Sequence, residues 1–219
     1  MDFFSSSYET WFILIRLNRC TLYSMNVHSP LILLCLSLVM TGPVEAESFS
    51  KYKNHKMYDR YFSKYAKRFF GAGFDWTHFK AQAIAESNLN IKAKSHVGAV
   101  GLMQIMPATF VEITQKNKFI EGSAGEPRWN IAAGISYNRS LWNYWRADRG
   151  FQDKLNFMFA SYNAGRGNIR KAQRFAEKER ANPNLWSTIE KHLVKVTGRH
   201  SRETLAYIDR IQIITKDIQ

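Results

Sequence analysis

The chain contains 219 residues, of which 45% are hydrophobic and 14% aromatic, and its formal net charge at pH 7 is +13. With 15 Phe, 10 Tyr and 6 Trp, it has too much apolar surface to remain intrinsically disordered. The 5 Pro and 12 Gly exclude a collagen-like or low-complexity sequence. The length allows one sizeable core and a small appendage.

The first 46 residues have the pattern of a secretory signal. Residues 31–40 form a continuous apolar run that is too short to span a bilayer, and small residues at the end of the next segment predict cleavage after Ala46. Translation could start at Met1 or at Met25, and only the longer leader has a cationic beginning. We therefore expect a signal peptide over residues 1–46 and export to the periplasm or cell envelope.

Removal of the leader changes the thiol content and the charge. Both cysteines, Cys20 and Cys35, lie inside it, so the mature chain would have no disulfide and no cysteine nucleophile. The leader holds one more acidic than basic residue, so the mature chain is still more cationic. An exported cationic protein is expected to meet an anionic cell wall or lipid headgroups rather than nucleic acid, and its basic residues form no compact recognition run.

From Tyr58 onward the apolar residues follow a helical period, and almost no alternation typical of strands is present. Asp75 and Asn130 are predicted helix N-caps, and Pro107 is predicted to begin a helix. The expected helical segments are a stripe of Tyr58, Phe62, Tyr65, Ala66 and Phe69 closed by Gly71 and Gly73; a helix after Asp75 with Phe79, Ala83 and Ile84 inside; one from Pro107; one through Ile131, Ile135, Trp142 and Trp145; one with Leu155, Met158, Phe159 and Tyr162, ended by Gly165 and Gly167; and helices over 168–181, 185–196 and 202–217. The sequence thus predicts a single all-α domain over residues 74–219, preceded by a short helical extension over residues 47–73.

Several catalytic classes find no support in the motifs. The six histidines show no HExxH or comparable zinc-ligand spacing. The chain also lacks the glycine-rich phosphate-binding loops and the G-x-S-x-G nucleophile motif. We expect neither a metal nor an organic cofactor.

Glu86 is the strongest candidate for acid–base chemistry. It lies at the end of an apolar helical segment, where Ser87 and Asn88 favour termination. Burial and the negative end of the helix dipole both disfavour a charged carboxylate, so we expect a raised pKa of the kind a general acid needs near neutrality. Position alone would equally fit an exposed glutamate at a helix end.

The segment that follows Glu86 combines backbone freedom with mixed polarity. Gly98 and Gly101 permit tight turns and close approach of a ligand. Met103 and Met106 offer flexible apolar contacts, and Gln104 offers an amide donor and acceptor. This mixture suits a saccharide, although the same residues could simply form a loop packed on a core.

A specific resemblance rests on several motifs in order. These are Glu86-Ser87, Ser95, Gly98-Ala-Val-Gly-Leu-Met-Gln104, Pro107-Ala-Thr109, Asn130-Ile-Ala-Ala-Gly134 and Ala160-Ser-Tyr-Asn-Ala-Gly165. From about Phe74 to the C-terminus, the chain resembles the catalytic domain of the soluble lytic transglycosylases, glycoside hydrolase family 23, which have a lysozyme-like fold of the goose type. The Phe74-Asp-Trp76 segment is similar to that of the membrane-bound murein transglycosylase F type. Two departures are Ser161, where alanine is usual, and a long basic segment before Arg202.

The resemblance implies a role for each matching residue. Glu86 corresponds to the single catalytic acid and base of the family. The residues that it implies for glycan binding are Ser95, Met103, Gln104, Met106, Tyr162, Asn163, Glu203 and Tyr207. For Tyr162, Asn163 and Tyr207, core packing with a satisfied polar tip is a competing interpretation.

The implied reaction is nonhydrolytic cleavage of the β-1,4 bond between N-acetylmuramic acid and N-acetylglucosamine in peptidoglycan, which yields 1,6-anhydromuramyl products. Ordinary glycosidases need two carboxylates, and the motif supplies one. A hydrolytic goose-type muramidase would need a second, for which Asp148, Asp153 and Glu203 are candidates without a supporting motif. A noncatalytic peptidoglycan-binding module of a secretion apparatus is a further alternative. The expected partner is a glycan strand, with possible cell-envelope or secretion machinery, and the expected state is a monomer.

Overall fold

The computed structural model describes residues 48–219, and the predicted signal peptide lies outside them. The described chain is helical, and its extended pairing is limited to two isolated bridges, Lys94 with Val100 and Val100 with Ile105. The elements are η1 (Ser50–Tyr52), α3 (Asp59–Phe70), α4 (Thr77–Ser87), α5 (Pro107–Lys116), α6 (Pro127–Tyr144), α7 (Phe151–Ala164), α8 (Arg166–Lys178), α9 (Trp186–Thr197), η2 (Gly198–His200) and α10 (Ser201–Ile218). The prediction of an all-α fold is confirmed.

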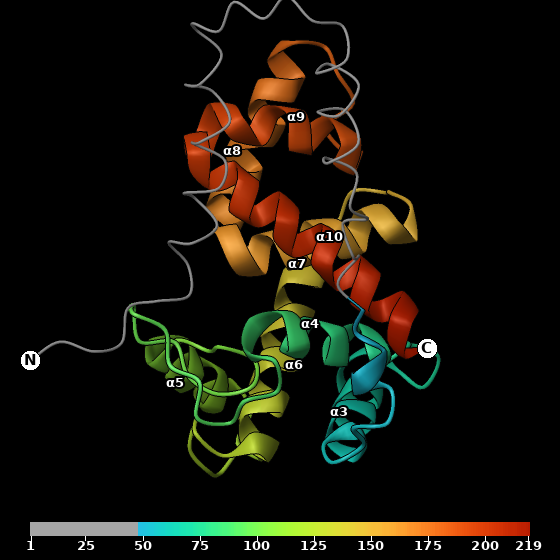
Figure 1. The fold of residues 1–219 in the computed structure, drawn as a ribbon. Helices are drawn as coiled ribbons and strands as arrows, with labels where there is room; N and C mark the ends of the chain where they lie inside the picture. Colours follow the sequence, from blue (N-terminus) through green and yellow to red (C-terminus); the bar gives the residue numbers. More distant parts are fainter. Residues whose placement is uncertain (1–47) are drawn as a thin grey trace, which may run out of the picture. The chain divides into compact units, whose positions relative to one another are not determined.

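Helix α4 lies in the interior and is covered from several sides. It packs against α10 and α3, while α6 packs against α3, α5 and α7. Six consecutive residues of α4, from Phe79 to Ile84, are buried, which a helix can reach only when neighbours surround it. In Figure 1, α10 runs diagonally across α7 and α4, with α8 and α9 above and α3 and α5 below. The helix that carries Glu86 is therefore held in the core.

The predicted N-terminal extension contributes to this same core. In α3, Phe62, Tyr65 and Ala66 are buried, as the predicted stripe required. The buried ammonium of Lys80 on α4 pairs with Asp59 Oδ1 at 2.9 Å and donates to the carbonyl of His55 at 2.8 Å. The described residues, 48–219, form one compact unit. The segment before Phe74 is thus packed into the domain that follows it.

The predicted helix ends are confirmed only in part. Oδ1 of Asp75 accepts the backbone N–H of Thr77 at 2.9 Å. The N-cap of α4 is nevertheless Trp76, so the prediction that Asp75 is the N-cap is wrong by one residue. The prediction that Asn130 caps a helix is wrong: α6 begins at Pro127, whose fixed φ suits the first helical position, and Asn130 lies within it. Gly165 ends α7 with φ of +81°, whereas Gly167 lies inside α8.

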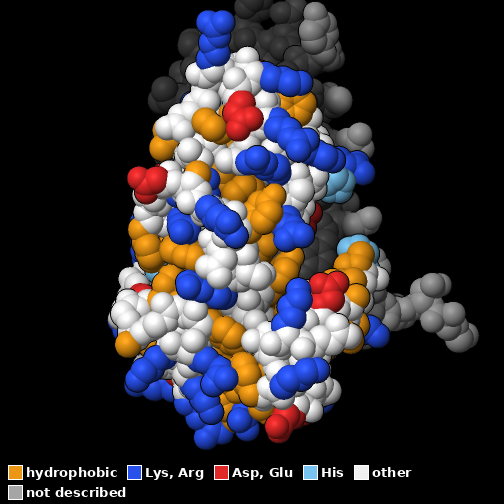
Figure 2. All heavy atoms as spheres, turned by 180° about the vertical axis from the view of Figure 1, so that it is seen from behind, with side chains coloured by type: hydrophobic (Ala, Val, Ile, Leu, Met, Phe, Trp, Pro, Cys, Tyr) orange, Lys and Arg blue, Asp and Glu red, His pale blue; other side chains and the backbone are white. Residues whose placement is uncertain are grey.

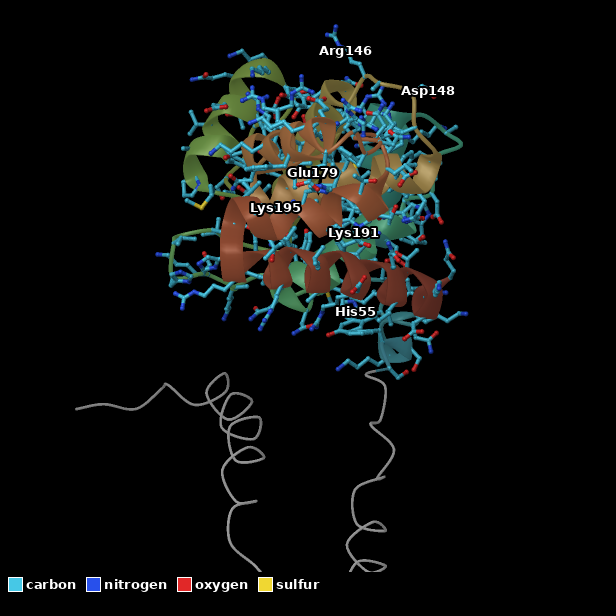
Figure 3. The ribbon with its side chains drawn as sticks, turned by 90° about the horizontal axis from the view of Figure 1, so that it is seen from above. His55, Arg146, Asp148, Glu179, Lys191 and Lys195 are labelled. Carbon is cyan, nitrogen blue, oxygen red and sulfur yellow. The ribbon has the colours of Figure 1, made fainter. Side chains whose placement is uncertain are left out.

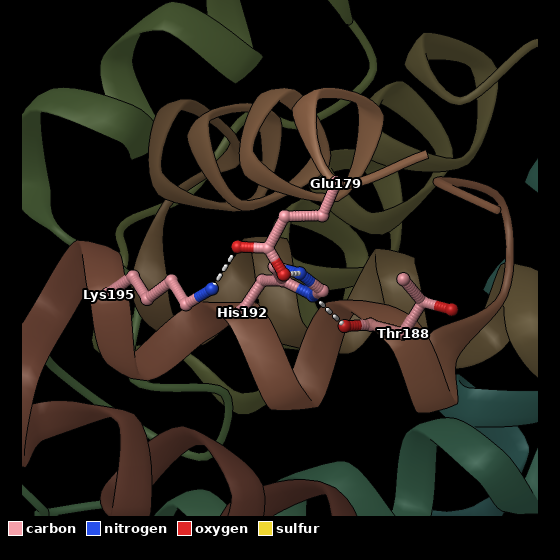
Figure 4. A network of polar contacts seen from close by, with 4 residues as sticks. All are labelled: Glu179, Thr188, His192 and Lys195. Atoms are coloured by element: carbon pink, nitrogen blue, oxygen red, sulfur yellow. Dashed lines mark hydrogen bonds and ion pairs between the residues drawn. The ribbon is translucent and has the colours of Figure 1, made fainter. Parts of the chain in front are cut away.

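The end of α8 is fastened to α9 by a small polar network (Figure 4). Glu179 accepts hydrogen bonds from Lys195 and from Nε2 of His192, the latter at 3.1 Å. Nδ1 of the buried His192 lies 2.7 Å from the carbonyl of Thr188. The hydrogen bond from Lys195 is the main cause of a lowered pKa for Glu179. These contacts fix the helical hairpin that rises above α7.

The surface is strongly cationic. Figure 2 shows Lys and Arg side chains spread over the face seen from behind, with few acidic groups among them. No helix in residues 48–219 is both long and apolar enough to cross a bilayer. A dispersed positive surface favours long-range attraction to anionic polymers.

Candidate active site

Glu86 lies in the last turn of α4, one residue before the helix ends. Asn88 terminates the helix in the left-handed conformation, with φ of 52°. Glu86 is half-buried, and burial raises the pKa of its carboxyl to about 7, while a hydrogen bond from Tyr207 partly opposes the rise. The predicted direction of the shift is confirmed, and desolvation is its largest cause.

Tyr207 reaches Glu86 from α10, far away in the sequence. Its hydroxyl donates to Oε1 of Glu86 at 2.5 Å, a short distance typical of a hydrogen bond to a carboxylate. Tyr207 is 8% exposed, and its oxygen accepts a hydrogen bond from Nε2 of Gln82 at 3.0 Å. The sequence placed Tyr207 among the glycan contacts, and the structure places its hydroxyl on the catalytic candidate itself.

The segment between α4 and α5 is held by side chains from both sides. The hydroxyl of Ser87 donates to the carbonyl of Leu102 at 2.9 Å. Asn130 on α6 accepts the N–H of Met103 at 2.7 Å and donates to the carbonyls of Val100 and Ala124. One amide thus satisfies three backbone groups of two loops, which explains why a buried asparagine is placed inside a helix.

Two glycines let this segment approach α6 closely. A Cβ on Gly101, where φ is +76°, would lie 2.5 Å from Nδ2 of Asn130. A Cβ on Gly134 of α6 would lie 2.8 Å from Cβ of Met103. The carbonyl of Met103 in turn accepts the hydroxyl of Tyr162 at 2.7 Å. The backbone at Met103 is therefore fixed by α6 on one side and by α7 on the other.

We expect the variant Gly134→Ala to lower the stability of the fold by about 1–3 kcal/mol, because the new methyl group would displace Met103 near its backbone. Gly167→Ala on α8 is the matched control, since its Cβ would meet nothing within 4 Å and alanine favours a helix. Chemical denaturation of both variants checks the prediction. Equal stability of the two would show that the contact at Met103 is not tight.

The other predicted glycan contacts on this segment have distinct settings. Ser95 is half-buried, and its Oγ accepts the N–H of Ala99 at 3.0 Å. Gln104, with φ of 43°, directs Nε2 to the carbonyls of Ala93 and Gly101. Met106 is exposed, whereas the side chain of Met103 is fully buried and packs in the core. A ligand at this surface would meet the side chain of Met106 and the half-buried Gln104, while Met103 lies beneath them.

The remaining predicted contacts lie on α7 and α10. Burial raises the pKa of Tyr162 well above its ordinary value, and Glu86 adds to the rise. Asn163 is exposed and accepts the hydroxyl of Thr204 at 2.8 Å, which joins α7 to α10. Glu203 is exposed and lies 4.0 Å from His200 in the same turn of the chain. Of the predicted set, Tyr162 and Tyr207 are the residues that interact electrostatically with Glu86.

None of the carboxylates considered for a hydrolytic site is among the groups that shift the pKa of Glu86. Oδ1 of Asp153 accepts the N–H of Trp186 at 2.7 Å, at the beginning of α9. Asp148 is exposed in the connection between α6 and α7, and Figure 3 labels it at the edge of the molecule. Within residues 48–219, no group of three or more His, Cys, Asp or Glu side chains has the arrangement of a metal site. Two surface hollows of about 350 and 460 Å³ adjoin α8 and contain none of the predicted site residues.

The sequence analysis did not identify two residues that are linked to Glu86 through the hydroxyl of Tyr207. Gln82 and Asn138 are both fully buried, and Nδ2 of Asn138 donates to Oε1 of Gln82 at 2.6 Å. Gln82 lies one helical turn before Glu86, on the same face of α4. A glutamine four positions before the catalytic candidate, between two apolar alanines, was the available signal.

A half-buried glutamate in the final turn of a central helix, beside a glycine-rich segment in an all-α domain, is the arrangement expected of the lysozyme-like class. Within that class, the model of the Transglycosylase SLT domain matches residues 61–185, more than half of the chain. The chain therefore belongs to the SLT transglycosylase-domain family. The match begins within α3, in the segment predicted as an extension.

The relatives include proteins named membrane-bound lytic murein transglycosylase F. One from Desulfosudis oleivorans is 31% identical over 150 residues, covering 64% of this chain and 32% of the relative. One from Shewanella pealeana is 27% identical over 182 residues, covering 77% of this chain and 36% of the relative. The chain thus spans about a third of the length of these relatives.

Solved structures support the same fold. The 70 kDa soluble lytic transglycosylase SLT70 of Escherichia coli matches with a TM-score of 0.55 and 27% identity, covering 74% of this chain and 24% of that one. The lytic transglycosylase Slt of Pseudomonas aeruginosa, at 21% identity, matches with a TM-score of 0.57, covering 73% of this chain and 23% of that one. The lysozyme-like fold expected from the motifs is therefore confirmed.

Proposed function

We propose that the protein is a peptidoglycan lytic transglycosylase with Glu86 as its only general acid and base. The observation that carries the proposal is the setting of this half-buried carboxyl, whose pKa is raised to about 7. Among the described residues, the hydroxyls of Tyr162 and Tyr207 interact with it, and no second carboxylate does. At this pKa the group is partly protonated near neutrality, so it can serve in both forms.

In the first step, Glu86 donates its proton to the oxygen that bridges N-acetylmuramic acid and N-acetylglucosamine. The bond between that oxygen and the anomeric carbon breaks, and the acetamide oxygen of the muramyl residue stabilises the positive charge. This group of the substrate takes the place of the second carboxylate of ordinary glycosidases.

In the second step, ionised Glu86 takes the proton of the muramyl 6-hydroxyl. The 6-oxygen attacks the anomeric carbon, which closes the 1,6-anhydro ring and returns Glu86 to its protonated form. Because nucleophile and electrophile belong to one bound sugar, the step is unimolecular and needs no activated water.

The glycan contacts in this proposal come from the segment between α4 and α5 and from α7. Ser95, Gln104, Met106 and Asn163 each retain accessible surface. The glycan would run past the exposed thioether of Met106, while the buried Met103 would support this segment from the core. Glu203 lies in the first turn of α10, so it would contact the glycan only if the bound strand reaches that turn.

Digestion of purified sacculi followed by mass spectrometry tests the proposal. We expect muropeptides that end in 1,6-anhydromuramic acid, each lighter by one water than the hydrolytic product. Products of the hydrolytic mass would instead identify a muramidase. Binding to sacculi without any released product would identify a noncatalytic wall-binding module.

The expected place of action is the cell envelope. The relatives are named membrane-bound murein transglycosylases, and a cationic surface suits an anionic wall. Export through a signal peptide over residues 1–46, action as a monomer and association with envelope or secretion machinery complete the proposal.

A further inference from the structure

A chain of buried amides lies behind the hydroxyl that contacts Glu86. Tyr207 accepts from Nε2 of Gln82 at 3.0 Å, and Oε1 of Gln82 accepts from Nδ2 of Asn138 at 2.6 Å. The side chains of Gln82 and Asn138 are fully buried. The chain joins α6 through α4 to α10, three helices that are distant in the sequence.

The direction of each hydrogen bond follows from the donors available. An amide nitrogen only donates and an amide oxygen only accepts, whereas a phenol has one proton to give. Because Asn138 donates to Gln82, the nitrogen of Gln82 faces Tyr207. The oxygen of Tyr207 then accepts, and its single proton is directed to Oε1 of Glu86. A neutral Glu86 must therefore carry its own proton on Oε2.

We propose that Gln82 and Asn138 are positioning residues that fix the hydroxyl of Tyr207 and so make Oε2 of Glu86 the oxygen that exchanges the proton with the glycan. The inference rests on the proposed function for its catalytic meaning. Its structural content, a fixed donor to Oε1, holds for Glu86 in any reaction.

The opposite orientation of the amides is unfavourable when Glu86 is ionised. With Gln82 reversed, its oxygen would take the proton of Tyr207, and the carboxylate of Glu86 would lose the donor that the structure gives it. A half-buried carboxylate without a donor is costly, so the ionised form selects the observed direction.

Stability alone does not account for the pair. Oδ1 of Asn138 is buried and has no hydrogen-bond partner, and a buried unsatisfied acceptor weakens a fold. Two apolar side chains of similar size would fill this space without that penalty. A purely structural role therefore does not explain two amides at this place.

The titratable groups that face Glu86 stay neutral over the pH range in which Glu86 itself titrates. They are the hydroxyls of Tyr162 on α7 and Tyr207 on α10, and burial raises the pKa of both well above the ordinary value. A change in the titration of Glu86 in these variants would thus report the hydrogen bond from Tyr207 rather than a new charge.

The experiment compares Gln82→Met, Asn138→Leu and the double variant with the parent. Carboxyl-carbon NMR of glutamate-labelled protein measures the pKa of Glu86, and release of muropeptides from sacculi measures the rate. Without the amide of Gln82, the hydroxyl of Tyr207 is no longer held in the orientation that donates to Glu86. The ionised form of Glu86 loses part of this hydrogen bond, so we expect the pKa of Glu86 to rise by about half a unit. We expect kcat to fall about fivefold to tenfold at an unchanged apparent KM, with the double variant at least as stable as the parent.

Two controls separate positioning from packing. Tyr207→Phe removes the donor, so Gln82→Met should add no further change in pKa when combined with it. Gln173→Met makes the same substitution at a buried glutamine on α8, which contacts Arg170 and Pro183, and should leave the titration of Glu86 unchanged.

The outcomes are distinct. An unchanged pKa of Glu86 in both Gln82→Met and the double variant would overturn the inference, whatever happens to the rate. A rise that persists in the Tyr207→Phe background would overturn it as well. If the parent cleaves no glycan, the proposed function fails, while the titration still decides the positioning role.

Discussion

Glu86→Gln is expected to abolish release of muropeptides, with a fall in rate of about 10³-fold or more. The amide has nearly the shape of the carboxyl but can neither give a proton to the leaving oxygen nor take one from the 6-hydroxyl. Both chemical steps depend on this one group in the proposed reaction, so no other residue should compensate. Sacculus digestion followed by chromatography measures the loss.

The control for this variant is Glu177→Gln, the same change at an exposed glutamate on α8. It should digest sacculi at the parent rate, and both variants should bind sacculi as the parent does. Residual activity of Glu86→Gln close to that of the parent would show that another group is the acid.

The helices were predictable because their apolar residues follow a helical period and end at strong local signals. Pro107 begins α5, and Gly165 breaks the chain between α7 and α8, as local chemistry requires. Glu86 was predictable because its motif lies next to it in the sequence. The signals for the helix ends and for Glu86 all lie within one or two helical turns of the residues that they identify.

What surrounds Glu86 was not predictable in the same way. Its donor Tyr207 lies 121 residues away, and the amide behind it, Asn138, lies 56 residues from Gln82. No local pattern determines which helices meet. Asn130 was misjudged for a related reason. Its residue type is typical of an N-cap, but inside α6 its amide binds three backbone groups of two loops, which no local pattern reveals.

A single carboxyl can act in two forms only if its two oxygens are treated differently. One oxygen of Glu86 is occupied by Tyr207 in either protonation state, which leaves the other to exchange protons. Burial brings the two states close in free energy near pH 7. The position in the core of α4 and the contact with α10 are thus both needed for the proposed chemistry.

The stability of Glu86→Gln relative to the parent is expected to depend strongly on pH. Burial raises the pKa of Glu86 from 4.5 to about 7 on folding. Below 4.5 the group is protonated in both states and folding costs nothing extra. Between 4.5 and 7 only the unfolded chain loses the proton, so the parent becomes less stable as the pH rises, and above 7 the full cost remains. The variant has no such proton to lose.

We therefore expect Glu86→Gln to be more stable than the parent at pH 8, by at most about 3 kcal/mol, with the difference closing toward pH 4.5. Urea denaturation at a series of pH values measures it, with Glu177→Gln showing no comparable trend. A gain of stability together with a loss of activity is the mark of a carboxyl kept buried for its chemistry. A constant difference across the range would mean that Glu86 ionises as readily in the folded as in the unfolded chain, and the acid role would lose its physical basis.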